Sequence, residues 1–202
     1  MKICGITRAE DAHAALQLGA NALGFVFWPK SPRFVDCDRA TAIIATLPPE
    51  VMTVGVFVNQ PVREINELAA RAGLTAVQMH GDESIADVRG ITRPMIKAVT
   101  PASDGSVEPE WPDEITLLVD AHDPVHRGGT GTRADWIAAR ALARRRKVLL
   151  AGGLNPANVA DAIAQVQPFG IDVSSGVERT PGIKDHQRLA DLFSAIAPPF
   201  KQ

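Results

Sequence analysis

Short apolar runs alternate with amphipathic stretches along the whole chain. There are eight such runs, and most of them are nearly continuous in hydrophobic residues, which is typical of parallel strands covered on both faces. They lie at 2–6, 22–27, 53–58, 76–80, 95–99, 116–121, 147–152 and 170–175. The stretches between them predict helices after residue 7 and at 38–47, 61–72, 84–89, 133–146, 156–166 and 185–197.

Helix-end signals and one exception refine this pattern. Thr7 and Glu10 have the spacing of a capping box, so a helix should begin there, and Gly19 is a suitable stop for it. Segment 100–114 contains three prolines and no apolar stripe, so it predicts a loop or a single turn.

Eight strands in strict alternation with helices predict an α/β protein. The strand count favours a single (β/α)8 TIM barrel over residues 1–202, with a shortened or missing helix after strand five. A doubly wound nucleotide-binding sheet would carry G-x-G-x-x-G after its first strand, and the sequence CGITRAED does not supply it.

Composition limits the partners that we expect. The 202 residues are 46% hydrophobic and 22% charged, as in ordinary globular domains, and the formal charge of −2 gives no reason to expect nucleic acid or membrane partners. No apolar run approaches the roughly 20 residues that span a bilayer, and no secretory signal is recognisable. The two cysteines, Cys4 and Cys37, form no C-x-x-C motif, so we expect reduced thiols and a cytoplasmic location.

The residues at the strand ends are the first candidates for chemistry, because (β/α)8 barrels place their active sites at the carboxyl ends of the strands. Cys4 follows the first strand core and Asp120 follows the sixth. A thiolate can take a proton from carbon and a carboxylic acid can give one to oxygen, so this pair suits an acid–base isomerisation. The sequence leaves open that Cys4 only packs and that Asp120 caps a helix or anchors a loop.

The seventh and eighth strands lead into turns that suit a phosphate. Gly152 and Gly153 let the backbone approach a ligand closely, and a helix begins a few residues later. Ser174, Ser175 and Gly176 offer hydroxyl and amide groups in the neighbouring loop, where barrels of this kind bind phosphate. The alternative is that these glycines only make tight turns.

Three other segments carry charge or flexibility. Arg33, in a proline-rich loop after the second strand, could clamp a carboxylate or could be a surface arginine. The glycine-rich stretch 127–131 is a plausible lid beside Asp120. The basic run 139–147 predicts a solvated helix face whose cations oppose the helix dipole.

The histidines do not predict a metal site. His122 and His126 are four residues apart, but Pro124 between them indicates a loop and not a helix. His80 is a lone histidine that we expect to be a rim or packing residue. We therefore expect neither a metal nor a cofactor.

Taken in order, the motifs of the chain resemble those of the phosphoribosylanthranilate isomerase family of tryptophan biosynthesis. They are KICGITRAEDA, ALGFVFWPKSPR, VGVFVN, VQMHGDE, IKA, LVDA, GGTG, DW, AGGLNPANV and GIDVSSGVE with a later PGIKD. They span nearly the whole chain, and the combination of the first, second and last blocks is highly specific. The resemblance implies an Amadori rearrangement of N-(5-phosphoribosyl)anthranilate to 1-(2-carboxyphenylamino)-1-deoxyribulose 5-phosphate, without metal or cofactor.

The same resemblance implies roles for individual residues. Cys4 would be the general base, Asp120 the general acid and Arg33 the ligand of the anthranilate carboxylate, with the turns around Gly153 and Ser175 binding the phosphate. A thiol of pKa about 8.5 and an aspartate of about 3.9 would then need the first pKa lowered and the second raised. We expect a monomer whose partner is this phosphorylated small molecule.

Two other interpretations stay open. A related or bifunctional Amadori isomerase of the histidine pathway would act on a sugar with two phosphates, and such enzymes carry an aspartate where this chain has Cys4. A barrel without activity, kept as a partner-binding module, is the second possibility. Cys4 and Asp120 are both present, which argues against an inactive barrel. A turnover assay distinguishes an active isomerase from an inactive barrel.

Overall fold

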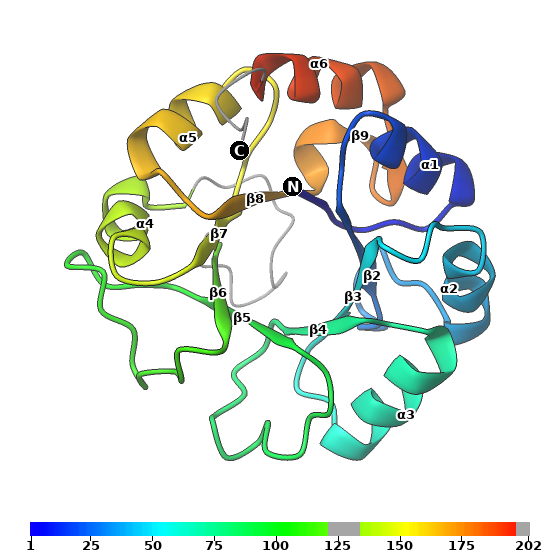
Figure 1. Cartoon of the computed structure of the whole chain (residues 1–202), viewed down its shortest axis with the longest axis horizontal. Coiled ribbons are helices and arrows are strands. Elements are labelled where there is room, and N and C mark those ends of the chain that lie inside the picture. The colour runs from blue at the N-terminus through cyan, green and yellow to red at the C-terminus, as the bar shows by residue number, and fades with distance from the viewer. Residues whose placement is uncertain (121–133, 197–202) are drawn as a thin grey trace.

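Eight parallel strands close into a barrel in the computed structural model, which describes residues 1–120 and 134–196 (Figure 1). The strands are β1 (Lys2–Ile3), β2 (Ala22–Val26), β3 (Met52–Phe57), β4 (Ala76–Met79), β5 (Met95–Val99), β6 (Thr116–Val119), β7 (Val148–Leu150) and β8 (Gly170–Val173). β1 pairs in parallel with both β2 and β8, which closes the ring. The predicted (β/α)8 barrel is confirmed.

The described residues form six α-helices, which lie around the barrel (Figure 1). They are α1 (Ala9–Gln17), α2 (Cys37–Ile44), α3 (Val62–Ala72), α4 (Trp136–Ala143), α5 (Val159–Val166) and α6 (His186–Ile196). In the described part of the chain, none of the helices has the length and apolar character needed to cross a membrane.

Helix α3 illustrates how the sequence sets these elements. Its buried residues Ile65, Ala69 and Ala72 recur at helical spacing and face the core, while charged residues occupy the other side. The helix ends at Gly73, whose left-handed backbone (φ 73°) lets its N–H donate to the carbonyl of Ala69.

Aliphatic side chains form one layer inside the barrel. Alternate residues along each strand point to the axis, and a buried cluster there comes from four strands and the residue after β7. Its members are Val54, Ala76, Ile96, Leu118 and Ala151. The larger buried residues, such as Phe25, Phe57 and Leu117, belong to the separate cluster between strands and helices.

Two connections lack helices. The loop prediction for 100–114 is confirmed, and with it the missing helix after the fifth strand. The helix predicted at 84–89 is wrong, because that segment forms only turns. Asp87 accepts hydrogen bonds from the amide and hydroxyl of Ser84, which stabilises a local turn, and six residues are too few to offset the cost of helix nucleation.

The predicted capping box at the start of α1 does not form. Arg8 is the N-cap residue, and no side chain caps the helix there. The hydroxyl of Thr7 instead donates to the carbonyl of Gly182 at 2.5 Å. A contact 175 residues away in sequence therefore takes the group that local spacing had assigned to the helix.

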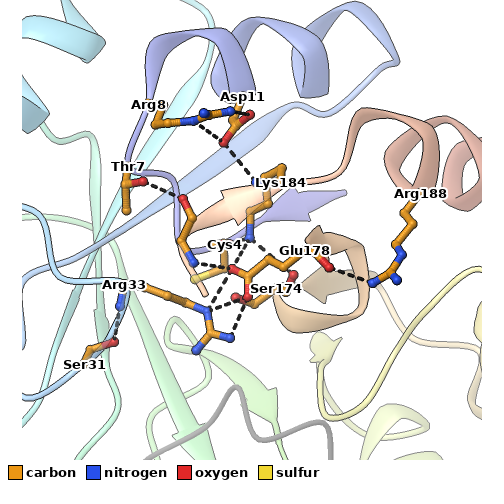
Figure 2. A network of polar contacts seen from close by, with 11 residues as sticks. Cys4, Thr7, Arg8, Asp11, Ser31, Arg33, Ser174, Glu178, Lys184 and Arg188 are labelled. Atoms are coloured by element: carbon orange, nitrogen blue, oxygen red, sulfur yellow. Dashed lines mark hydrogen bonds and ion pairs between the residues drawn. The ribbon is translucent and has the colours of Figure 1, made fainter. Parts of the chain in front are cut away.

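Gly182 belongs to a small hairpin that the sequence pattern did not predict. After β8 the chain makes a short 3-10 turn, η1 (Ser175–Val177), and then the antiparallel strands β9 (Glu178–Thr180) and β10 (Ile183–Lys184). This hairpin lies beside the segment that joins β1 to α1 (Figure 2).

Arg146 holds the loop that replaces the missing helix. Its guanidinium donates to the backbone carbonyls of Trp111, Pro112 and Ile115, and its side chain is only 12% exposed. Arg145 similarly donates to the carbonyl of Asp104. The prediction of a solvated basic face at 139–147 is therefore wrong for Arg146, whereas Arg145 is exposed as predicted.

Replacing Arg146 by Met should destabilise the barrel by about 2–3 kcal/mol, because the loop carbonyls lose their hydrogen-bond donor. Urea unfolding measures this change in the free energy of unfolding. The exposed neighbour Arg144 is the matched control, and Arg144→Met should change stability little. Equal stabilities of the two variants would contradict this role of Arg146.

Candidate active site

The end of β1 places the thiol of Cys4 inside the mouth of the barrel. The amide of Cys4 donates to the carbonyl of Val173 at 2.9 Å, so the residue still follows the ladder between β1 and β8. Its side chain is 8% exposed and packs with Val26 and Val56. Gly24 on β2 makes the room, because a Cβ there would lie 2.7 Å from the Cys4 sulfur.

Three charged groups surround this thiol. Lys2, two residues earlier on β1, pairs with Asp172 of β8 at 2.9 Å, and both side chains are almost fully buried. The ammonium of Lys184, from β10, donates to the carbonyl of Cys4 at 2.5 Å. The base candidate therefore lies between two lysines and one aspartate.

These charges act on the pKa of Cys4 in opposite directions. Burial raises the pKa of the thiol above its ordinary value, and Asp172 adds to the rise, whereas Lys2 and Lys184 lower it. The net shift is upward, so the expectation of a lowered thiol pKa is wrong. A raised pKa makes the thiolate a stronger base but a smaller fraction of the protein at neutral pH.

Asp120 follows β6 directly and faces a histidine. Its carboxylate lies 3.4 Å from Nε2 of His80, the residue that follows β4, and both side chains are mostly buried. Nδ1 of His80 is 2.8 Å from the amide nitrogen of Gln78. His80 is thus a neighbour of the acid candidate, where it can exchange a proton with it or hold its orientation.

Arg33 is buried and not on the surface. Its Nε donates to Glu178 at 2.9 Å and Nη2 donates to the same carboxylate at 2.7 Å. Gly5 allows this path, because a Cβ there would lie 2.6 Å from Cδ of Arg33. Arg33 therefore runs alongside Gly5, the residue next to Cys4, and Figure 2 shows Arg33 and Cys4 in one polar network.

The two turns predicted to bind phosphate lie against each other. Gly152 and Gly153 both have left-handed backbones, with φ of 79° and 63°, and Asn158 donates to the carbonyl of Gly153. Gly176 in the other turn lies so close to Leu154 that a Cβ would be 1.9 Å from its carbonyl oxygen. Glycine is required there by space.

Two serines belong to the second turn. Ser174 follows β8, and its hydroxyl is buried without a hydrogen-bond partner among the described residues. Ser175 begins η1 and is partly exposed. A buried hydroxyl in this position can bond an oxygen atom of a ligand.

Part of the sequence prediction lies outside the described residues. His122, His126 and the glycine-rich stretch 127–131 fall in segment 121–133. Within residues 1–120 and 134–196, no three His, Cys, Asp or Glu side chains gather as metal ligands would.

Sequence reasoning missed several polar residues that line or support the site. They are Lys2, Gln78, Asp172, Glu178 and Lys184, all at most 8% exposed. A signal existed for the first three, because each interrupts an otherwise apolar strand of a barrel buried on both faces. Glu178 and Lys184 had no such signal, since their hairpin has no apolar periodicity.

Comparisons with known proteins agree with this geometry. The family model described as N-(5'phosphoribosyl)anthranilate (PRA) isomerase matches residues 1–195. A protein of Pelobacter propionicus named N-(5'-phosphoribosyl)anthranilate isomerase is 45% identical over 194 residues, which is 96% of this chain and 93% of that protein.

Solved structures give the same result. The phosphoribosyl anthranilate isomerase of Thermus thermophilus superposes with a TM-score of 0.85 at 38% identity, covering 97% of both chains. A second isomerase, solved with reduced 1-(o-carboxyphenylamino)-1-deoxyribulose 5-phosphate, has a TM-score of 0.79 at 39% identity over 96% of both chains. The chain thus belongs to the phosphoribosylanthranilate isomerase family, the isomerases of tryptophan biosynthesis.

Proposed function

We propose that the chain converts N-(5-phosphoribosyl)anthranilate to 1-(2-carboxyphenylamino)-1-deoxyribulose 5-phosphate with Cys4 as general base and Asp120 as general acid. The observation that carries this assignment is their placement directly after β1 and β6, on the same rim of one barrel. A thiol and a carboxyl group there can serve the two ends of one proton-transfer reaction.

The reaction requires two proton transfers before the final tautomerisation. Asp120 protonates the ring oxygen of the furanose, the C1–O bond breaks, and the nitrogen lone pair forms the C1=N bond of an iminium ion. The thiolate of Cys4 then takes the proton from C2. The electron pair of the broken C2–H bond forms the C1–C2 double bond of an enolamine, and the electron pair of the C1=N bond returns to the nitrogen. The enolamine gains a proton at C1 and loses the one on the C2 oxygen, which gives the ketone.

Binding of the substrate uses the two ends of the molecule. We assign the phosphate to the adjoining turns of Gly152–Gly153 and Ser174–Gly176, where glycine backbones and a buried hydroxyl are available. The related isomerase with a reduced product bound supports a ligand that carries both a phosphate and an aromatic carboxylate.

Arg33 is the proposed ligand of the anthranilate carboxylate. A guanidinium has five N–H donors on two edges, and Glu178 occupies the edge that contains Nε. Bidentate binding of a second carboxylate would then use the edge of Nη1 and Nη2.

The proposed active unit is a monomer, because one chain supplies all the residues assigned above. The proposed location is the cytoplasm, where free thiols such as Cys4 and Cys37 stay reduced. The related isomerase of Thermotoga maritima is dimeric, so light scattering of the preparation used for kinetics should accompany the assay. A mass of two chains in the active fraction would contradict the monomer.

The purified protein should isomerise freshly made phosphoribosylanthranilate without added metal or cofactor. Cys4→Ala and Asp120→Ala should each lower kcat by about 100-fold to 10,000-fold, the effect of one positioned acid or base. The two losses should not add in the double variant, because both groups serve one reaction coordinate. Fluorescence-monitored turnover measures the rates.

Cys37→Ser is the matched control for the thiol, because Cys37 lies at the start of α2 and packs against the cluster between strands and helices, not with Cys4. It should turn over like the parent protein. Circular dichroism establishes that each variant is folded. If folded Cys4→Ala kept the parent rate, Cys4 would be a packing residue and the assignment of the base would be wrong.

Arg33→Ala should lower kcat/KM for phosphoribosylanthranilate. The fall should correspond to a loss of about 2–3 kcal/mol of transition-state binding free energy, as expected for a lost charge-assisted pair. The same variant should lose much less with phosphoribosylaniline, which lacks the carboxylate. Arg63→Ala on the exposed side of α3 is the control. An equal loss of kcat/KM with both substrates would show that Arg33 does not recognise the carboxylate.

Substitutions of the buried ion pair should move the pKa of Cys4 in opposite directions. Lys2→Met removes the charge that lowers the thiol pKa most and should raise it further, whereas Asp172→Asn should lower it. The pH dependence of iodoacetamide alkylation at Cys4, followed by peptide mass spectrometry, reports both shifts. Lys147→Met, at the opposite end of the barrel, is the control. Shifts of the same sign would mean that the variants act through general damage.

A further inference from the structure

The geometry of the β9–β10 hairpin points to a further residue of the site. We infer that Glu178 is a positioning residue that fixes the guanidinium of Arg33 for recognition of the substrate carboxylate, and that Lys184 holds Glu178 in place. This inference rests on the carboxylate-binding role proposed for Arg33.

The carboxylate of Glu178 accepts hydrogen bonds along one edge of the Arg33 guanidinium. Nε of Arg33 lies 2.9 Å from Oε1 and 3.2 Å from Oε2, and Nη2 lies 2.7 Å from Oε2. Both side chains are less than 10% exposed. A planar guanidinium held at two points has a fixed orientation, so its other edge also has a fixed direction.

Glu178 is itself held at several points. Lys184 donates to Oε1 at 2.9 Å, and the amide of Gly182 donates to the same oxygen at 3.2 Å. Burial alone would raise the pKa of Glu178, but the bonds from Arg33 and the charge of Lys184 keep it below its usual value. Glu178 is therefore a carboxylate at neutral pH, in the charge state that binds Arg33.

The same lysine connects this pair to the rest of the site. Its ammonium also donates to the backbone carbonyls of Cys4 at 2.5 Å and of Ser174 at 3.3 Å (Figure 2). Lys184 thus contacts the segments of the proposed base and of the second proposed phosphate turn, and Glu178 of the same hairpin contacts the proposed carboxylate ligand, Arg33.

The charges of Arg33, Glu178 and Lys184 should affect which substrate is recognised as well as the stability of the fold. Arg33 and Lys184 both contact the single carboxylate of Glu178 in this cluster. If Glu178 lost its charge, Arg33 and Lys184 would repel each other and Arg33 would lose its orientation. Recognition of the carboxylate should suffer more than the chemistry at the sugar.

The test compares phosphoribosylanthranilate with phosphoribosylaniline in Glu178→Gln, which keeps the shape of the side chain. The ratio of kcat/KM for the two substrates should fall on the order of 10-fold to 100-fold, as expected for a displaced binding group. In Arg33→Ala the ratio should fall as well, and the double variant should show no further loss.

Glu83→Gln is the matched control. Glu83 is the other buried glutamate paired with a buried lysine, Lys97 at 2.8 Å, and it does not contact Arg33. This variant should lose stability, but both substrates should be affected alike, so their ratio should stay near that of the parent. A purely structural role of Glu178 predicts the same behaviour for Glu178→Gln.

The outcomes separate the two proposals. If Arg33→Ala keeps the parent ratio, the role proposed for Arg33 itself fails. If Arg33→Ala loses the ratio and folded Glu178→Gln keeps it, the inference on Glu178 is overturned. Should Glu178→Gln not fold, Glu178→Asp keeps the charge but withdraws it from Arg33, and an unchanged ratio in that variant overturns the inference equally.

Discussion

Closure of the barrel by pairing of β1 with β8 is the constraint on which the site depends. The register sets Lys2 opposite Asp172 and Ile3 opposite Val173, so the next residue, Cys4, lies beside the start of the turn at Ser174–Gly176. A shift of one residue would turn Lys2 and Cys4 away from the barrel axis. The same pairing therefore buries the ion pair of Lys2 and Asp172 and places the thiol of Cys4 inside the mouth of the barrel.

Much of the fold could be predicted because strands and their ends are local features. The eight apolar runs correspond to the eight barrel strands, and Cys4, His80 and Asp120 each follow one of them directly. The failures came where a distant contact decides the outcome. The hydroxyl of Thr7 bonds the hairpin and does not cap α1, and Arg146 bonds loop carbonyls and does not face solvent.

The site was predictable as a set of candidates but not as an arrangement. Sequence order placed Arg33 in a loop without indicating its partner, because Glu178 lies 145 residues later in a hairpin without apolar periodicity. The direction of the Cys4 pKa shift also required the structure, since it depends on burial and on charges from β1, β8 and β10. Polar residues within apolar barrel strands were the one local signal of this environment.

The burial of Cys4 also determines how the thiol responds to oxidants. Peroxides and disulfides react with the thiolate, and they need access to the sulfur. With 8% of the residue exposed and a raised thiol pKa, both requirements are poorly met at neutral pH. The burial that raises the pKa of this thiol therefore also protects it from conversion to sulfenic acid.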